Sequence, residues 1–211
     1  AIGELVVEKS GVLNLGQEGM LLVGAVVGFI AASVTGNYFL ATFCAIFAGM
    51  GMAFLFGYLS ITLASNQVAT GLALTIFGGG LSAFLGTNYI GIGLEGIQVW
   101  SVPLLSDIPV IGKVLFQHDP LVYLTLTLFA LVFWVFRSTR LGLKIRAVGE
   151  NPEAANAIGI NVQQIRFMAV LFGGAMTGLA GAYLSLVYTP MWSDGMSAGR
   201  GWIALSLVVF A

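Results

Sequence analysis

Charged residues are scarce in this sequence. Asp, Glu, Lys and Arg together make up 8% of its 211 residues, whereas a soluble domain carries about 25%. Hydrophobic residues make up 58%, and the mean hydropathy is +0.99. So few charges cannot cover a water-exposed surface, and we therefore expect the chain to lie in a membrane. The net charge of −1 gives no indication of a nucleic-acid partner.

Metal ligands and redox-active residues are almost as scarce. The single cysteine, Cys44, lies in an apolar run and has no second cysteine with which to form a disulfide or a thiolate metal site. The single histidine, His118, has no second histidine with which to share a metal. The sequence also contains no Gly-x-x-x-x-Gly-Lys-Ser/Thr loop for nucleotide phosphates. We therefore expect no metal, no cofactor, no catalytic residue and no ATP site in this chain.

Long uncharged runs dominate the sequence. No Asp, Glu, Lys or Arg occurs at residues 19–94, and one bilayer crossing takes roughly 20 apolar residues. The runs are continuous and do not alternate, which favours helices over strands. We predict an all-α, polytopic transmembrane bundle with five complete spans, at 12–34, 38–64, 66–88, 120–136 and 167–189. A sixth span begins near Trp202 and is cut short, and we interpret residues 1–211 as one transmembrane domain that is truncated at both ends.

Two longer connectors separate the spans. Residues 89–119 predict a loop, in which a short helix around Trp100 is one alternative and an interfacial aromatic belt includes Trp100 and Tyr89. Residues 137–166 hold five of the eight basic residues, namely Arg137, Arg140, Lys144, Arg146 and Arg166. The positive-inside rule then places 137–166 in the cytoplasm and 89–119 on the opposite side. This pattern predicts a multi-pass membrane protein.

The cytoplasmic connector encodes a short helix at residues 152–158. Asn151 is a suitable N-cap, and Pro152 suits the first helical position. Glu153 lies in the first turn, where the helix dipole favours a carboxylate, and Gly159 is a C-terminal stop. The exposed surface of such a helix is small and mildly apolar. The residues alone leave two readings open: a helix that docks in a groove of another protein, or a solvated connector.

Four segments give the chain a specific resemblance. The segment Gly-Glu-Asn-Pro-Glu-Ala-Ala-Asn-Ala-Ile-Gly-Ile-Asn at 149–161 resembles the coupling loop of importer permeases of the ATP-binding-cassette class. Those permeases serve ribose-type sugars, branched-chain amino acids and nucleosides. The segments Ser-Gly-Val-Leu-Asn-Leu-Gly-Gln-Glu-Gly-Met at 10–20 and Gly-Met-Ser-Ala-Gly-Arg-Gly-Trp-Ile at 195–203 are similar to the nucleoside-type branch. Residues 65–74 fit that branch too.

The resemblance implies a set of partners and a set of contact residues. The partners are a second permease in a heterodimer, two cytoplasmic ATPase subunits that bind ATP and Mg, an extracytoplasmic substrate-binding lipoprotein and the lipid bilayer of a bacterial cytoplasmic (inner) membrane. The resemblance also implies that this chain lacks the opening helix and several closing helices of the family. The residues that match the coupling loop, and are therefore expected to contact an ATPase, are Gly149, Glu150, Asn151, Pro152, Glu153, Ala154, Ala155, Ile158 and Gly159.

Polar residues at the ends of the spans are candidates for a substrate path: Asn14, Glu18, Asn66, Gln67, Thr70 and Arg200. Glu18 is the only acid beside a membrane-spanning run, where it either faces a water-filled path or caps its own helix. Asn66 is a suitable N-cap, whereas Gln67 and Thr70 lie three apart on one helix face, which favours an inner lining. Arg200, between two glycines, is either an interfacial anchor or a hydrogen-bond donor to a polar solute.

These features favour the permease subunit of an ATP-driven importer that carries a small neutral polar solute, most specifically a nucleoside. A ribose-type sugar is the alternative solute. A channel or a secondary carrier is less favoured, because ion-coupled carriers place ionisable residues near the midplane. A membrane-embedded enzyme would need clustered acids, histidine or an activated serine at membrane depth, and the predicted spans contain none of these.

Overall fold

The computed structural model describes residues 1–98, 100–101 and 117–210, with only the backbone described at 100–101. Five helices are long and apolar enough to cross a membrane, which confirms the all-α, multi-pass prediction. They are α2 (Gln17–Thr35), α3 (Tyr38–Gly57, continued by the π-helical η1, Tyr58–Thr62), α4 (Gln67–Gly86, continued by η2, Thr87–Tyr89), α6 (Pro120–Ser138) and α9 (Val162–Tyr183, continued by the π-helical η3, Leu184–Tyr188).

Shorter elements complete the described chain. The helix α1 (Ile2–Lys9) precedes the first span, and α7 (Arg140–Glu150) and α8 (Pro152–Ala157) join α6 to α9. The helix α10 (Arg200–Val209) is apolar but too short to cross a membrane. The strands β1 (Trp100–Ser101) and β2 (Gln117–His118) form one antiparallel pair.

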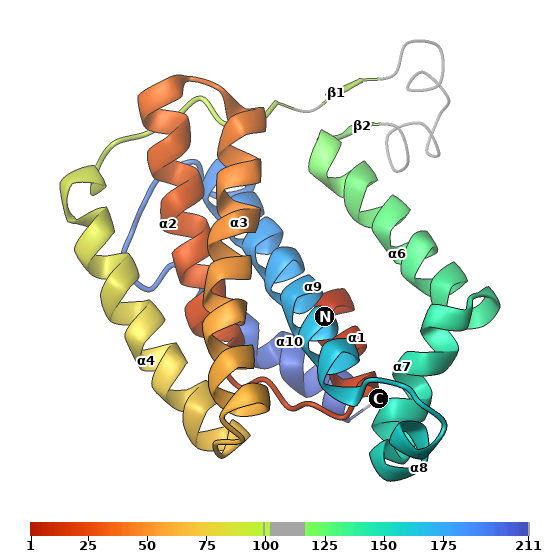
Figure 1. The fold of residues 1–211 in the computed structure, drawn as a ribbon. Helices are drawn as coiled ribbons and strands as arrows, with labels where there is room; N and C mark the ends of the chain where they lie inside the picture. The colour runs from red at the N-terminus through yellow and green to blue at the C-terminus, as the bar shows by residue number, and fades with distance from the viewer. Residues whose placement is uncertain (99, 102–116, 211) are drawn as a thin grey trace.

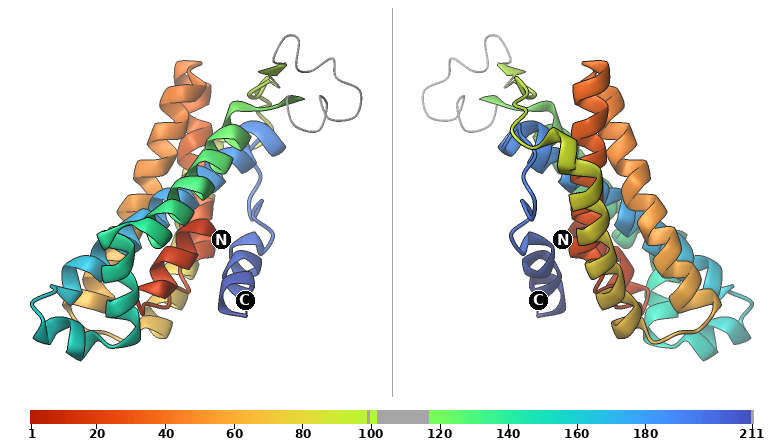
Figure 2. Two further views of the ribbon diagram at one scale, coloured as in Figure 1. Left: turned by 90° about the vertical axis from the view of Figure 1, so that its right-hand side faces the viewer. Right: turned by 90° about the vertical axis from the view of Figure 1, so that its left-hand side faces the viewer.

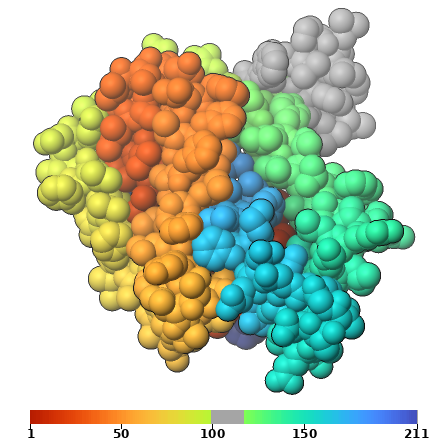
Figure 3. Space-filling model, viewed as in Figure 1, coloured from red at the N-terminus to blue at the C-terminus, as the bar shows by residue number. Residues whose placement is uncertain are grey.

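Helices α2, α3 and α9 form the centre of the bundle, with α4 against α2 on one side and α6 on the other (Figure 1). Glycines bring the central helices into backbone contact. A Cβ atom on Gly24 would lie 2.7 Å from Cα of Gly178, and one on Gly49 would lie 2.8 Å from the same Cα. Such small residues let helices approach closely where no hydrophobic effect drives them together. The space-filling view shows part of α9 exposed between α3 and α6 (Figure 3).

The two connectors lie at opposite ends of the bundle (Figure 1). Helices α7 and α8 lie at the end where α3 ends and α4 begins, and β1 and β2 lie at the other end, near the turn between α2 and α3. This arrangement agrees with the alternation expected from the charges. Asp119 starts α6, because its carboxylate accepts hydrogen bonds from the N–H groups of Leu121 (3.0 Å) and Val122 (3.1 Å).

Several predicted boundaries are wrong. The first span begins at Gln17 rather than residue 12, because α1 and a non-helical connector at residues 10–16 precede it. The last complete span begins at Val162 rather than residue 167, because Asn161 caps it by accepting a 3.0 Å hydrogen bond from the N–H of Gln164. Residues 140–150 of the basic connector form the helix α7, which the sequence reading did not predict.

The outer connector differs from the alternative considered for it. At Trp100 the backbone forms a short strand instead of a helix. Residues 99 and 102–116, which include Pro103, Asp107, Pro109 and Lys113, lie outside the described residues, as does the Trp100 side chain. The aromatic belt is therefore described only at Tyr89, which packs edge-to-face on Phe29.

Candidate functional site

The connector at residues 10–16 is a largely buried, non-helical segment, and side chains from other helices bind its backbone. Gln67 of α4 accepts a 3.0 Å hydrogen bond from the N–H of Leu13, and Thr75 of α4 donates a 2.9 Å hydrogen bond to the carbonyl of Leu15. Arg166 of α9 donates a 3.2 Å hydrogen bond to the carbonyl of Ser10. Buried irregular backbone requires such partners, so the connector is held in a defined position.

A row of polar side chains begins where this connector meets α2. Gln17 donates a hydrogen bond to the Glu4 carboxylate on α1 and accepts one from the Thr177 hydroxyl on α9. All three residues are buried, and Glu4 is only 2% exposed. The consecutive helices α1 and α2 and the distant helix α9 therefore meet at one continuous hydrogen-bonded row.

This polar row forms part of the wall of a cavity of about 680 Å³. The cavity lies between α1, α2, α6, the upper part of α9 and α10, and Figure 2 shows α10 beside α1. Leucines of α6 and α9 and Tyr183 form much of the remaining wall. A cavity of this size, apolar with a few polar groups, suits a small solute.

The Glu18 carboxylate does not line this cavity, because it is hydrogen-bonded to the segment that starts α10. The carboxylate accepts hydrogen bonds from the Ser197 hydroxyl, from the N–H of Gly199 (2.9 Å) and from the N–H of Gly201 (2.7 Å). A carboxylate is favoured at a helix N-terminus because it satisfies unpaired N–H groups and opposes the helix dipole. Glu18 therefore caps α10 and not α2, an arrangement that neither of the two sequence-based readings described.

Arg200 lies at the edge of the cavity. Its guanidinium group lies over the Tyr188 ring, 4.8 Å from the centroid, and donates a 3.3 Å hydrogen bond to the carbonyl of Met196. Such a cation–π contact orients the flat guanidinium group. Arg200 and the polar row thus lie on the wall of the same cavity.

The other candidate path residues lie away from this cavity. Asn14 is fully buried in the connector, where its side chain accepts a 3.0 Å hydrogen bond from the N–H of Gly16. Asn66 caps α4 by accepting a 3.1 Å hydrogen bond from the N–H of Ala69. Thr70 and Ser65 share a 2.9 Å hydrogen bond between their hydroxyl groups. The structure therefore brings Gln67 to the connector and Arg200 to the cavity, and leaves Asn66 and Thr70 at the start of α4.

Glu4 and Thr177 belong to the site but were missing from the sequence-based candidates. The statement that Glu18 is the only acid beside a membrane-spanning run is wrong, because Glu4 is buried within the bundle. The apolar residues around Glu4 in α1 are a signal that could have identified it. Nothing in the local sequence shows that Thr177 contacts Gln17, because the two are 160 positions apart.

The connector between α6 and α9 contains the predicted capped helix. Asn151 accepts a 2.9 Å hydrogen bond from the N–H of Ala154, and Pro152 occupies the first turn. Gly159 has a φ of +84°, a conformation that ends the helix and that glycine adopts without strain. These three predictions are confirmed, although α8 ends at Ala157, one residue earlier than predicted.

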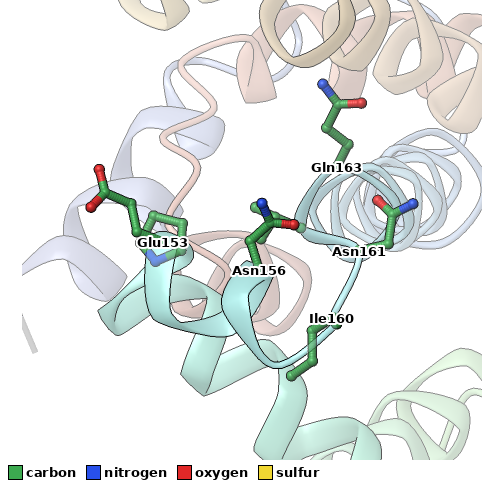
Figure 4. Close-up of a pocket in the computed structure, with 8 residues that line it drawn as sticks. Glu153, Asn156, Ile160, Asn161 and Gln163 are labelled. Carbon is green, nitrogen blue, oxygen red and sulfur yellow. The ribbon is translucent and has the colours of Figure 1, made fainter.

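The surface around α8 is open. Ile158 is 76% exposed and Ala154 is exposed, whereas Ala155 is buried against the rest of the chain. A hollow of about 590 Å³ separates α8 from the start of α9. Figure 4 shows Glu153 and Asn156 on one side of it and Gln163 on the other. The hollow and the exposed Ile158 form a surface that another protein can contact.

Close backbone packing joins this surface to the connector at residues 10–16. A Cβ atom on Gly149, at the end of α7, would overlap the carbonyl oxygen of Lys9, and one on Gly11 would lie 3.2 Å from Cα of Gly149. Arg166, near the start of α9, holds the next part of the connector at Ser10. The end of α7 therefore packs directly against the connector that leads into the polar row.

A comparison with protein families matches the chain over its full length. The model of the branched-chain amino acid transport system / permease component family matches residues 1–211. The chain belongs to this permease family. Its match covers the connector, the polar row and the α7–α8 surface, and it confirms the resemblance found in the sequence.

Three curated relatives match the whole of this chain. The putative glucose ABC transporter permease protein TsgC13 of Haloferax volcanii is 44% identical over 214 residues, which are 65% of its length. The nucleoside ABC transporter permease protein NupC of Lactococcus lactis subsp. cremoris is 33% identical, and the guanosine ABC transporter permease protein NupQ of Bacillus subtilis is 30% identical, each over 70% of its length. The chain thus spans about two thirds of the length of these relatives. No solved structure matches it.

Proposed function

We propose that this chain is part of the permease subunit of an ATP-driven importer and forms its translocation path for a small neutral polar solute. The observation that carries the proposal is the capped helix α8, which is exposed at one end of the bundle and directly follows α7, whose Gly149 packs onto the connector that leads to the cavity. The family match supports it, because the family is described as a permease component of a transport system.

The proposed partners follow from this surface. Two cytoplasmic ATPase subunits bind ATP and Mg, and one of them contacts α8 and the hollow beside it. A second permease completes the path as a heterodimer, and an extracytoplasmic lipoprotein delivers the solute from the side of residues 89–98. All of them assemble at the cytoplasmic membrane.

The proposed mechanism uses the contacts of the described chain. ATP-driven motion of the partner displaces α8 and α7, and Gly149 passes that displacement to Lys9 and the connector. The connector then shifts Gln17 relative to α1 and α9, which changes the wall of the cavity. A ligand-driven change of this kind requires that α8 docks differently in the two states.

The preferred solute is a nucleoside. A cavity with aromatic and leucine side chains on its wall and a polar row beside them suits a molecule with a flat base and a hydroxylated ring. The names of NupC and NupQ refer to nucleoside and guanosine transport. A sugar is the second candidate, because the 44% identical relative is named as a putative glucose permease.

Uptake of labelled solutes tests this function. The full-length permease and its partner subunits are expressed in cells that lack their own nucleoside and sugar importers, and uptake of uridine, adenosine, glucose and ribose is compared. ATP-dependent uptake of uridine or adenosine above that of both sugars is expected. Uptake of glucose or ribose without uptake of either nucleoside would show that the solute is a sugar. Uptake of all four solutes without ATP would indicate a channel or a secondary carrier.

A further inference from the structure

An apolar groove of about 330 Å³ lies between α1 and α6, and the left view of Figure 2 shows these helices side by side. One face of each helix lines it, because the lining residues recur at spacings of three and four. They are Phe129, Val132, Phe133 and Phe136 of α6 and Ile2 and Leu5 of α1. Apart from two basic residues at one end, every side chain that lines the groove is apolar.

The two basic residues are Lys9, the last residue of α1, and Arg146 of α7. Both side chains are exposed, and neither forms an ion pair or a side-chain hydrogen bond within the residues that the structure describes. The neighbouring acids Glu8 and Glu150 do not line the groove. One end of an apolar groove therefore presents two accessible positive charges without a partner carboxylate.

The length of the groove suits one leaflet of a bilayer. Phe129 and Phe136 are seven residues apart on α6, which gives a rise of about 10 Å, and the hydrocarbon of one leaflet is about 15 Å thick. The helix α6 is long enough to cross a membrane, and at its end the Arg137 guanidinium group lies over the Phe133 ring, 5.9 Å from the centroid. An acyl chain in the groove therefore brings its phosphate to the level of the basic residues.

We propose that this groove binds an anionic phospholipid, with one acyl chain between α1 and α6 and with the phosphate bridging Lys9 and Arg146. Basic pockets between transmembrane helices on the cytoplasmic side suit anionic head groups. A protein partner would have to place a carboxylate at this depth, whereas an anionic lipid always has its phosphate there. Gly149, three residues after Arg146, packs on the carbonyl of Lys9, so the bound lipid strengthens the same contact between α1 and α7.

Lipid binding to the purified full-length permease, together with the subunits that co-purify with it, tests the proposal. Native mass spectrometry counts the bound lipids during titration with palmitoyl-oleoyl phosphatidylglycerol and, separately, with the phosphatidylcholine that has the same acyl chains. The ratio of the two affinities reports the contribution of the head-group charge. Glycerol phosphate, a head group without acyl chains, is added as a competitor and is expected not to displace the phosphatidylglycerol.

The native protein is expected to prefer phosphatidylglycerol by about 25-fold, because each basic residue near an anionic head group contributes about fivefold. Lys9→Gln and Arg146→Gln each lower this ratio about fivefold, and the double variant lowers it to about one. Arg146→Lys retains the ratio. The matched control is Lys144→Gln, which removes a charge from α7 outside the groove and leaves the ratio unchanged. Leu5→Trp fills the groove and weakens the binding of both lipids.

Four results would overturn the inference. An unchanged ratio in the double variant would exclude Lys9 and Arg146 as the phosphate site, and an equal fall in Lys144→Gln would show a general effect of surface charge. Unchanged binding of phosphatidylglycerol by Leu5→Trp would exclude the groove as the site of the acyl chain. A native ratio of about one would leave the groove to the partner permease or to another part of the full-length chain. If the double variant does not fold, the two single variants decide.

Discussion

The carboxylate of Glu18 accepts a 2.7 Å hydrogen bond from the backbone N–H of Gly201, 183 positions later in the chain. The same carboxylate binds Gly199 and Ser197, so one acid at the start of α2 fixes the turn before α10. Gly201 is required at this contact, since a Cβ atom there would lie 2.7 Å from Cα of Glu18. The position of α10 beside the cavity thus depends on Glu18.

Glu18→Ala is expected to destabilise the permease by about 3 kcal/mol, because it leaves buried donors without an acceptor. Glu18→Gln keeps one acceptor oxygen and is expected to cost about 1 kcal/mol. Thermal unfolding of the purified importer in detergent measures both changes. Glu95→Gln serves as the control, because Glu95 is exposed. Equal unfolding temperatures for Glu18→Ala and Glu95→Gln would show that the contact does not stabilise the fold.

Gly49→Ala is expected to weaken the packing of α3 on α9. The added Cβ atom would lie 2.7 Å from the backbone N of Gly178, and such overpacking costs about 1–3 kcal/mol. The matched control is Gly79→Ala, at a glycine with nothing within 4 Å of the new atom. Alanine favours a helix by up to about 1 kcal/mol over glycine, so this control is expected to raise the unfolding temperature slightly. A similar effect of both substitutions on that temperature would contradict the packing described.

The sequence was sufficient for features that depend on local physics. Hydropathy located the five spans, and the properties of Asn151, Pro152 and Gly159 located α8 and its ends. The helix α7 was missed because its charged residues break the apolar pattern on which the spans were recognised.

Contacts between distant residues could not be predicted from one sequence. Glu18 is in the first turn of α2, so a local reading makes it a cap of its own helix, but its donors come from residues 197–201. Gln67 was assigned to an inner lining on helix periodicity, and its side chain accepts from the connector at Leu13. The hydrogen bond of Glu4 could not be predicted for the same reason, because its partner Gln17 lies on another helix.

Asn151→Ala is expected to reduce the uptake rate because α8 loses its N-cap, at a cost of about 1 kcal/mol to the helix. Asn151→Asp keeps the acceptor oxygen and is expected to retain uptake. Initial rates of solute uptake in proteoliposomes distinguish the two variants. If the alanine and aspartate variants transport at the same rate, the cap at α8 has no part in coupling.

Substitution on the surface of α8 is expected to separate solute binding from transport. Glu150→Lys reverses a charge beside α8, and Ala154→Trp adds a bulky side chain at an exposed position. Each is expected to abolish uptake while the external binding protein still binds solute, with Ala154→Ser as the conservative control. The check is uptake together with co-purification of the ATPase subunits. Normal uptake by Ala154→Trp with ATPases bound would rule out coupling through α8.

ATP dependence of uptake tests the account most directly. The full-length permease, its partner permease, the ATPases and the loaded binding protein are assembled in proteoliposomes, and labelled uridine uptake is measured with ATP, without ATP and with an ATPase that binds but does not hydrolyse ATP. The account predicts uptake only when ATP is hydrolysed. Uptake at the same rate without hydrolysis would contradict it.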